Sequence, residues 1–376
     1  MRFVSNEGQR VYEVKDLKSI SIELILENQS SSGAYVASPN FPVYRYSWLR
    51  DGSFIAYSML INGEMDSCKK YLDWVHETIL RHKSKVAVME SKLAANQPLN
   101  PHDFLSARYT LDGEEVQDSW PNFQVDGYGT WLWCLSEYCE LTSNVGCIKE
   151  FEESIRITID WLRIVWKFPN YDCWEENGDQ VHPSSLACVY GGIQGINRFL
   201  KEDNLSELCH DVRRFILSNL TEDGRFPKYV GSNSVDSSLL WLSVPFSVVE
   251  HDHPVMRRTV QAIEEKLLVE GGVRRYPEDT FYGGGQWILL SCWLAWYYLK
   301  IGKLQEANQL YEWTIMQSDE RGYLPEQVRT GTSDPDIVRK WKKQWGGVAK
   351  PLLWSHSMFL VLVRELECLQ SRDGCR

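Results

Sequence analysis

The stretch GQWILLSCWLAWYY (285–298) is apolar on nearly every face of the helix that it would form, and so is PLLWSHSMFLVLV (351–363). A helix that is apolar all round must be buried. The stretch PVMRRTVQAIEEKLLV (254–269) instead has one apolar and one charged face, which suits a helix at the surface. Together, the two kinds of helix predict an inner ring of buried helices wrapped by an outer ring.

Helical periodicity continues in both directions from these stretches. Apolar residues recur at helical spacing in 13–28 and again in 64–82. Strand signals are few and short, and no linker or low-complexity stretch divides the chain. We therefore expect an all-α fold in a single domain (1–376), with an N-terminal helix and lead-in (1–40) before the larger part (41–370). Further helices are expected at 52–62, 125–142, 147–166, 183–200, 203–220, 285–301, 303–318 and 353–370.

Composition and charge narrow the classes of partner. Hydrophobic residues make up 43% of the 376 residues and charged residues 24%, which is ordinary for a globular protein. The formal net charge is -11, whereas nucleic acids and anionic lipids require a basic surface. No stretch reaches the roughly 18 apolar residues that a membrane span needs. We therefore expect neither a nucleic-acid nor a membrane partner, and the sequence does not predict the oligomeric state.

The ten cysteines bear on the compartment. None lies in a CxxC pair, so neither a zinc ribbon nor a thioredoxin motif is indicated. Cys134 and Cys292 lie in apolar helical stretches, where a free thiol behaves as a small hydrophobic group. The first residues, MRFVSNEGQRVYEVKDLKS (1–19), lack the apolar core of a signal peptide. Free thiols without an export signal predict a reducing cytoplasm.

Aromatic and charged residues gather in predicted loops and at helix ends. The 16 Trp, 18 Tyr and 13 Phe residues suit either a well-filled helical core or the stacking of rings on sugars. Hydrolysis of a sugar needs one carboxylic acid to protonate the leaving oxygen and one carboxylate to activate water. Five segments combine rings with such groups: YRYSWLRDGSF (44–54), RYTLDGEEVQDSWPNFQVDGYG (108–129), YDCWEENGDQVHPSS (171–185), RRYPEDTFYGGGQW (274–287) and GYLPEQV (322–328).

These segments resemble motifs of glycoside hydrolase family 15, the glucoamylases and their relatives. The motifs YxYxWxRDxS, YDxWEExNG, RYPEDTxYxGxxW and GxLPEQ occur in that family in the same order, and PLLWSHSMF (351–359) resembles its closing segment. The resemblance spans about residues 44–360, and five motifs in order are far more specific than one. It implies an (α/α)6 barrel, which agrees with the two kinds of helix.

The resemblance also implies roles for individual residues. Glu175, the first Glu of WEE, corresponds to the general acid, and Glu326 of LPEQ corresponds to the general base of an inverting reaction. We expect Trp174 and the anionic Glu176 beside Glu175 to favour its protonated form, and a loop position to give Glu326 access to water. The family's sugar-gripping and wall positions fall on Arg50, Asp51, Arg275, Glu176, Trp48, Trp120, Trp174 and Trp354.

Some of these residues also have plain structural interpretations. Glu175 and Glu176 suit the N-terminus of a helix, where acidic side chains complement the dipole. Arg50 and Asp51 suit a local ion pair that caps a helix beginning at Gly52. Asp126 is equally well explained as a helix cap, and Arg108 as a member of the site wall or as a surface residue.

Other motifs are expected to be inert. His251 and His253 have a metal-like spacing, but the following Pro254 indicates the start of a helix. His356 lies in an apolar helix and suits a satisfied core histidine. The stretch KKQWGGVAK (342–350) reads as a solvated loop at the rim of the site, and the charged segment after LPEQ is expected to line the entrance. No metal or cofactor motif is found.

The predicted substrate is a small oligosaccharide. A cytoplasmic enzyme meets imported oligosaccharides rather than polymers, and small members of this kind resemble isomaltose glucohydrolases. We therefore expect exo-acting, inverting release of β-glucose from the non-reducing end of short α-glucosides, with isomaltose and isomalto-oligosaccharides favoured over α-1,4 malto-oligosaccharides. Two alternatives stay open: a non-catalytic sugar-binding regulatory domain on the same barrel, and a trehalase-type hydrolase.

Overall fold

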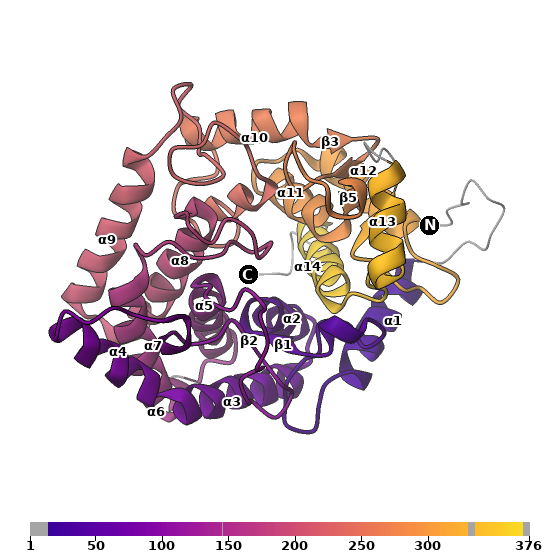
Figure 1. The fold of residues 1–376 in the computed structure, drawn as a ribbon. Helices are drawn as coiled ribbons and strands as arrows, with labels where there is room; N and C mark the ends of the chain where they lie inside the picture. Colours follow the sequence, from indigo (N-terminus) through magenta and orange to yellow (C-terminus); the bar gives the residue numbers. More distant parts are fainter. Residues whose placement is uncertain (1–13, 145, 330–334, 371–376) are drawn as a thin grey trace.

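Twelve helices of the computed structural model, which describes residues 14–144, 146–329 and 335–370, form two concentric rings (Figure 1). Outer and inner helices alternate along the chain. The outer ring consists of α1 (Val14–Glu27), α3 (Met65–His82), α7 (Glu152–Val165), α9 (Asp203–Ser218), α10 (Pro254–Lys266) and α12 (Leu304–Met316). The inner ring consists of α2 (Leu49–Ile61), α5 (Asp126–Leu141), α8 (Pro183–Leu200), the 3-10 helix η3 (Ser237–Leu242), α11 (Ile288–Lys300) and α14 (Leu353–Gln370).

The inner ring closes on itself. Each inner helix contacts the next, from α2 through α5, α8, η3 and α11 to α14, and α14 returns to contact α2. The outer helices α3, α9 and α12 pack on their inner neighbours α2, α8 and α11. This closed double ring is the (α/α)6 barrel that the sequence predicted.

Burial separates the two rings as the patterns of the sequence suggested. Every residue of α11 from Ile288 to Leu299 is buried. In α9 the buried Leu205, Leu208, Val212 and Ile216 recur at helical spacing, and much of the rest of the helix is exposed. The apolar helices therefore form the inner ring, because a place in the outer ring would expose one of their apolar faces to water.

Glycines set the close approach of α5 and α8. A Cβ atom on Gly192 would lie 2.2 Å from the carbonyl oxygen of Gly129, and one on Gly129 would lie 2.3 Å from the backbone of Cys188. Real side chains do not reach such distances, so only glycine allows the two backbones to touch here. This contact joins two neighbouring helices of the inner ring, α5 and α8.

Aromatic side chains fill the barrel axis. The ring of Phe54 lies 5.6 Å from that of Trp241 and 5.7 Å from those of Trp133 and Trp354. Trp293 completes the cluster, 4.9 Å from Trp241. The helical-core interpretation of the aromatic composition is therefore correct for this set, which draws on α2, α5, η3, α11 and α14.

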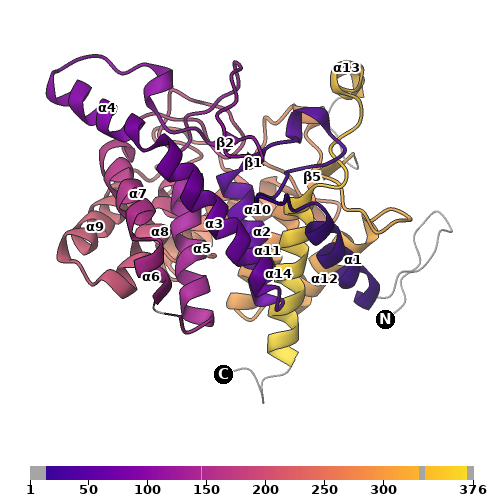
Figure 2. The same cartoon turned by 90° about the horizontal axis from the view of Figure 1, so that it is seen from below.

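Short strands organise one end of the barrel. β1 (Ser47–Trp48) pairs with β2 (Arg108–Tyr109), and β3 (Leu268–Val269), β4 (Gly272–Val273), β5 (Gln286–Trp287) and β6 (Gln327–Val328) form an antiparallel sheet. β1 runs directly into α2 and β5 into α11, so both strands lie at N-terminal ends of inner helices. Figure 2 shows β1, β2 and β5 with long loops at one end of the molecule, opposite the end at which α14 finishes. Long loops of this kind are where function concentrates.

Several sequence expectations were wrong in detail. The fourth inner helix, η3, lies in a stretch where no helix was expected, because six residues are too few to show helical periodicity. α4 (Ser84–Ala94) and α13 (Pro335–Trp345) were also missed, since each buries only one or two side chains. The expected helix 147–166 is divided at Phe151 into α6 (Gly146–Glu150) and α7. Short 3-10 turns complete the chain at η1 (Pro42–Tyr44), η2 (Pro101–Asp103) and η4 (Phe281–Gly283).

The cysteines are not all free. Cys139 at the end of α5 and Cys147 in α6 form a disulfide, which the sequence did not predict because the two residues lie in no recognisable motif. Buried free thiols are found at Cys68, Cys134, Cys173, Cys188, Cys209 and Cys292. Cys375 lies outside the described part of the chain, as do most of the first 19 residues. None of the helices described here is both long enough and apolar enough to cross a membrane.

Candidate active site

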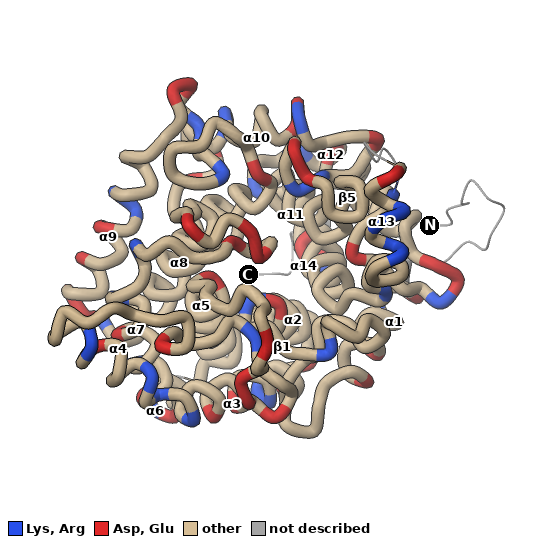
Figure 3. The backbone as a smooth tube through the Cα atoms, in the orientation of Figure 1, with Lys and Arg blue, Asp and Glu red and all other residues tan. Residues whose placement is uncertain are grey.

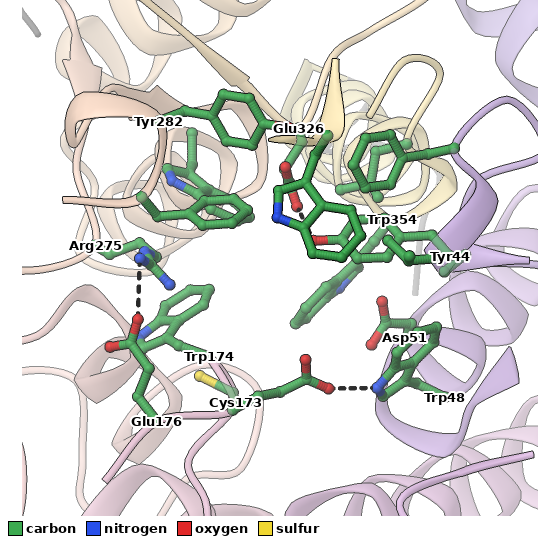
Figure 4. A pocket seen from close by; sticks show the side chains of 18 of the residues that line it. Tyr44, Trp48, Asp51, Cys173, Trp174, Glu176, Arg275, Tyr282, Glu326 and Trp354 are labelled. Carbon is green, nitrogen blue, oxygen red and sulfur yellow. Dashed lines mark hydrogen bonds and ion pairs between the residues drawn. The ribbon is translucent and has the colours of Figure 1, made fainter. Parts of the chain in front are cut away.

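A pocket of about 350 Å³ opens at the end of the barrel that carries the strands. Its volume is in the range of small-molecule sites, roughly 300–1,000 Å³. The structure brings all ten candidate residues of the sequence to its lining, and Figure 4 shows seven of them labelled. They are Trp48, Arg50, Asp51, Trp120, Trp174, Glu175, Glu176, Arg275, Glu326 and Trp354.

A tight turn presents Glu175 to the pocket. One carboxylate oxygen of Asp172 accepts hydrogen bonds from the backbone N–H groups of Trp174 and Glu176, both at about 3 Å, and the Asp172 carbonyl accepts from that of Glu175. Glu175 itself has φ of 66°, a left-handed conformation that a non-glycine residue adopts only when its surroundings enforce it. The turn precedes the start of α8 at Pro183, so the helix-dipole interpretation of Glu175 and Glu176 is wrong.

The carboxyl group of Glu175 is held from across the pocket. The indole N–H of Trp48 (Figure 4) donates to Glu175 Oε1 at 2.6 Å. The amide of Gln124 lies 3.4 Å from the same oxygen. The neighbours of Glu175 in sequence are engaged elsewhere: the Trp174 indole donates to Asp236, and Glu176 faces Arg275. The Glu175 carboxyl is therefore hydrogen-bonded by Trp48 and Gln124 rather than by its sequence neighbours Trp174 and Glu176.

Arg108 supports Trp48 from behind. Its side chain is 1% exposed, and its guanidinium lies 5.3 Å from the Trp48 ring, 4.4 Å from the Trp120 ring and 4.7 Å from the Tyr46 ring. The pairing of β1 with β2 places Trp48 opposite Arg108. Arg108 therefore belongs to the wall of the site, where it fixes two indoles, rather than to the surface.

Glu326 has different surroundings. It directly precedes β6, and its backbone N–H donates to Ala349 O at 2.9 Å. Its side chain is 3% exposed, with Oε1 accepting from the Tyr44 hydroxyl at 3.0 Å. Burial raises the pKa of Glu326 to about 8, although the Tyr44 hydrogen bond and the charge of Arg275 oppose the rise. The expected open, loop-like access is absent at this residue, but Oε2 has no protein hydrogen-bond partner among the described residues.

Arg50 and Asp51 form a charged pair in the first turn of α2. Arg50 Nε lies 3.3 Å from Asp51 Oδ2, and Arg50 Nη1 is bound by Gln124 at 2.7 Å and by Asp126 at 3.1 Å. Burial raises the pKa of Asp51 to about 6, against the attraction of Arg50. The expected ion pair is confirmed, but the helix begins at Leu49 rather than at Gly52, so the pair lies inside the helix and does not cap it. Both residues line the pocket, and their contact with a ligand stays a prediction. Asp126 is buried behind Arg50 and does not line the pocket, which makes it a support for the pair.

Arg275 forms a second buried cationic group. Its Nε donates to Asp279 at 2.8 Å, and its Nη2 lies 3.3 Å from Glu176 Oε1. Glu176 also accepts from the Tyr276 hydroxyl. Arg275 is therefore held by two carboxylates at the edge of the pocket, with its planar head directed by the bidentate contact to Asp279.

Lys228 is a functional-site residue that the sequence did not predict. Its ammonium is buried 3.3 Å from Asp236, 3.8 Å from Glu176 and 3.9 Å from Asp172, and it lies over the ring of Tyr276. Burial raises the pKa of Asp172, which His182 and Lys228 counter. Lys228 lies in a loop with no motif, so only the folded chain shows that it links three acids beneath the turn of Glu175.

Other pocket residues were missed for the same reason. Tyr44 and Phe281 lie in two of the aromatic-rich segments, but the sequence predicted no role for them. Trp341, Gln344 and Trp345 lie on the unexpected helix α13. Residues 342–345, interpreted as loop, are the end of this helix, although their place beside the pocket is as expected. No signal in the sequence distinguishes these rings from core aromatics.

His253 and His356 have the structural roles that the sequence predicted for them. His253 caps α10, its ring accepting from the backbone N–H of Val255, and Pro254 is the first helical residue. His356 is buried between Ser21 and the backbone N–H of Leu324, and burial lowers its pKa to about 3. Within the described ranges, no cluster of His, Cys, Asp and Glu side chains is arranged to hold a metal ion.

Comparison with known proteins decides the family. The model of glycosyl hydrolases family 15 matches residues 15–333. The chain belongs to this family. It is 36% identical, over 97% of its length and 95% of the relative, to a protein of Kribbella flavida named isomaltose glucohydrolase. It is 23% identical to trehalase 1 of Sulfolobus acidocaldarius, over 73% of this chain and 50% of that protein.

Solved structures of this family agree. A glycosidase variant in complex with glucose has a TM-score of 0.90 and 35% identity, covering 94% of this chain and 96% of that one. The glucoamylase of Saccharomycopsis fibuligera has a TM-score of 0.74 at 15% identity, with 98% and 99% of the two chains covered, and shares the fold. This family 15 chain is a glycoside hydrolase with an (α/α)6 barrel.

Proposed function

We propose that the chain is an inverting, exo-acting α-glucosidase that releases β-glucose from short α-glucosides. One observation carries the proposal: two carboxyl groups, Glu175 and Glu326, share a pocket with the buried Arg50–Asp51 pair and indole walls in a chain of family 15. A charged pair that binds hydroxyl groups, rings that stack on a pyranose and two carboxyl groups are what glycoside hydrolysis requires.

In the proposed reaction Glu175 is the acid and Glu326 the base. Glu175 gives its proton to the glycosidic oxygen as the bond to the anomeric carbon breaks. Glu326 takes a proton from a water molecule, whose oxygen forms the new bond from the opposite face of the sugar. Inversion of an α-linked substrate yields β-glucose, and the proton gained by Glu326 restores Glu175 through solvent.

The surroundings of Glu175 and Glu326 also suggest the opposite assignment, in which Glu326 is the acid. A general acid usually has the raised pKa, and burial raises that of Glu326 to about 8. Two observations support Glu326 as the base: the Tyr44 hydroxyl donates to it, which favours the carboxylate, and Oε2 has no protein partner in the described part of the chain. The Trp48 N–H occupies one oxygen of Glu175 and leaves the other for a proton.

An α-1,6-linked disaccharide is the proposed first substrate. The relative with 36% identity and nearly full mutual coverage is named for isomaltose, whereas the trehalases match at 22–24% identity over 42–60% of their length. We rank α-1,4-linked malto-oligosaccharides next and trehalose third. A purely sugar-binding role is the competing class, and the retention of both carboxyl residues speaks against it.

The test is a panel of glucose disaccharides that differ only in linkage, assayed for glucose with the parent and with Glu326→Gln. We expect isomaltose to have the highest kcat/KM, early product to be the β-anomer by NMR, and Glu326→Gln to lose about 10³-fold in kcat while still binding glucose. Early α-anomer, or parental turnover by the variant, would contradict the mechanism. Binding of sugars without any glucose release would establish the regulatory alternative.

The wider organisation is proposed on the same basis. We infer one catalytic domain, because the inner ring takes helices from residue 49 to residue 370. The cytoplasm stays the proposed compartment on the strength of the six buried free cysteines Cys68, Cys134, Cys173, Cys188, Cys209 and Cys292. The Cys139–Cys147 disulfide is the observation that favours an oxidising compartment instead.

A further inference from the structure

The helix α13 stands at the outer rim of the pocket. Figure 2 shows it beyond the strands and loops at the end of the barrel, and Figure 1 shows it over the α14 side of the ring. It contacts η4 (Phe281–Gly283), which belongs to the loop between β4 and β5. Arg50, Asp51 and Trp354 lie in the first turns of inner helices, so they form the floor of the pocket, whereas α13 forms part of its mouth.

Aromatic contacts hold α13 in place. The Trp341 ring stacks on that of Tyr282, with centroids 5.5 Å apart and planes at 26°, and meets the edge of Phe281 at 4.9 Å. The hydroxyl of the buried Tyr282 donates to Gly347 O at 3.1 Å, just after the helix ends. One aromatic pair therefore fixes both the middle and the C-terminal end of α13.

The two faces of α13 differ in chemistry. Trp341, Gln344 and Trp345 line the pocket, whereas the basic residues Arg339, Lys340, Lys342 and Lys343 are exposed and absent from its lining. Figure 3 shows these basic positions along the helix. The pocket-facing side therefore offers rings and one amide, a surface suited to an uncharged, hydroxyl-rich ligand rather than to an anion.

Trp345 is unusual because it is 41% exposed although it lines the pocket. A large indole with a free face at the edge of a cavity is an available platform for a flat apolar surface, such as the C–H face of a pyranose. Trp120 and Pro121 also line the pocket, next to Trp48, which bonds the proposed acid Glu175. Because the acid protonates the leaving group, we expect the leaving group to lie on the side of the pocket that Glu175, Trp48 and Trp120 line.

We propose that Trp345, together with Gln344 and the anchored Trp341, forms the binding site for the sugar ring of the leaving group. The inference rests on the proposed function, since it assumes that the floor of the pocket holds the glucosyl unit. A glucosyl unit bound by Arg50 and Asp51 directs the remaining ring of a disaccharide toward the mouth, where α13 stands. The occupant is one neutral pyranose, stacked on the indole and bonded by the amide.

The experiment compares a substrate that has a sugar leaving group with one that has none. The variant Trp345→Ala is assayed on isomaltose and on α-D-glucosyl fluoride, with Trp345→Phe as the variant that keeps a ring. Lys343→Ala, on the opposite face of α13, is the control for general damage to the helix. The melting temperature of each variant shows whether the fold is preserved.

We expect Trp345→Ala to raise KM for isomaltose about five- to tenfold, with a several-fold smaller effect on the fluoride, because only isomaltose has a ring to stack. Trp345→Phe should restore much of the loss, and Lys343→Ala should match the parent on both substrates. Equal losses on both substrates, or an unchanged KM for isomaltose, would overturn the inference. If the parent hydrolyses neither substrate, the proposed function fails and this inference falls with it.

Discussion

The two carboxyl groups of the pocket are held in opposite ways. Glu175 lies half-buried in a turn whose backbone is fixed by the side chain of Asp172, and Trp48 donates to its carboxyl at 2.6 Å. Glu326 is 3% exposed, accepts from Tyr44, and directs an oxygen without a protein partner among the described residues into the site. Hydrogen bonds hold Glu175 in position, whereas burial is the main feature of the surroundings of Glu326.

The difference shows how one pocket can give two equal side chains unequal tasks. A turn held by hydrogen bonds fixes the direction of Glu175, which a proton donor needs to reach one particular oxygen. Burial makes ionised Glu326 costly, and burial is what raises its pKa to about 8. A carboxylate with a raised pKa is a stronger base once it is ionised. Burial therefore makes the charge of Glu326 costly and, for the same reason, makes Glu326 an effective base.

Removing the buried cation beneath the turn is expected to have the largest effect on this comparison. Lys228 is the cation that Asp172, Glu176 and Asp236 share, and without it these acids are buried with less compensation. We expect Lys228→Met to lower kcat on isomaltose about 10²-fold, with glucose affinity much less affected, because Glu175 loses its direction. Steady-state kinetics and glucose titration measure the two quantities.

The matched variant Lys228→Arg retains the positive charge at this position. It should recover a large part of kcat if the charge matters, although the larger guanidinium has to fit the same space. Parental kcat in Lys228→Met would show that the turn holds Glu175 without help from the cation.

A smaller effect is expected on stability at the other carboxyl. The pKa of Glu326 is about 8 in the folded chain against an ordinary value of 4.5, so its contribution to stability is present below pH 4.5 and is lost as the pH rises through 8. Glu326→Gln removes the ionisation. We therefore expect its melting temperature to equal that of the parent near pH 4.5 and to exceed it by roughly 2–5 °C at pH 9.

Thermal unfolding of parent and variant across this pH range checks that expectation. The same experiment on Glu175→Gln provides the comparison, since Glu175 lies in a half-exposed turn. A difference between parent and Glu326→Gln that does not change with pH would show that Glu326 is not the buried, costly charge described above.

The sequence predicted the parts of this site that are local. Arg50, Asp51, Glu175, Glu176, Arg275 and Glu326 lie in short motifs, and an inner ring follows from helices that are apolar on every face, so both could be expected before the fold was known. The position of Arg108 between β1 and the indoles needed strand pairing that two-residue strands do not announce.

What could not be predicted depends on contacts distant in sequence. Lys228 meets acids 56 and 52 residues before it only because the loop after α9 folds under the turn of Asp172 and Glu176. Tyr44 reaches Glu326 across 282 residues. The helix α13 is recognisable only from the contact of Trp341 with Tyr282, since charged residues make up nearly half of its sequence and it buries only Val338. The sequence therefore failed to predict contacts between distant parts of the chain, whereas it did predict which residues could carry the chemistry.

The most direct test of the division of labour between Glu175 and Glu326 compares isomaltose with α-D-glucosyl fluoride in Glu175→Gln. Fluoride leaves with little help from an acid, whereas the sugar leaving group of isomaltose needs a proton. The account predicts that Glu175→Gln loses about 10²–10⁴-fold on isomaltose and keeps most of its kcat on the fluoride, while Glu326→Gln fails on both. The reverse pattern, with the fluoride rescuing Glu326→Gln and not Glu175→Gln, would contradict it and make Glu326 the acid.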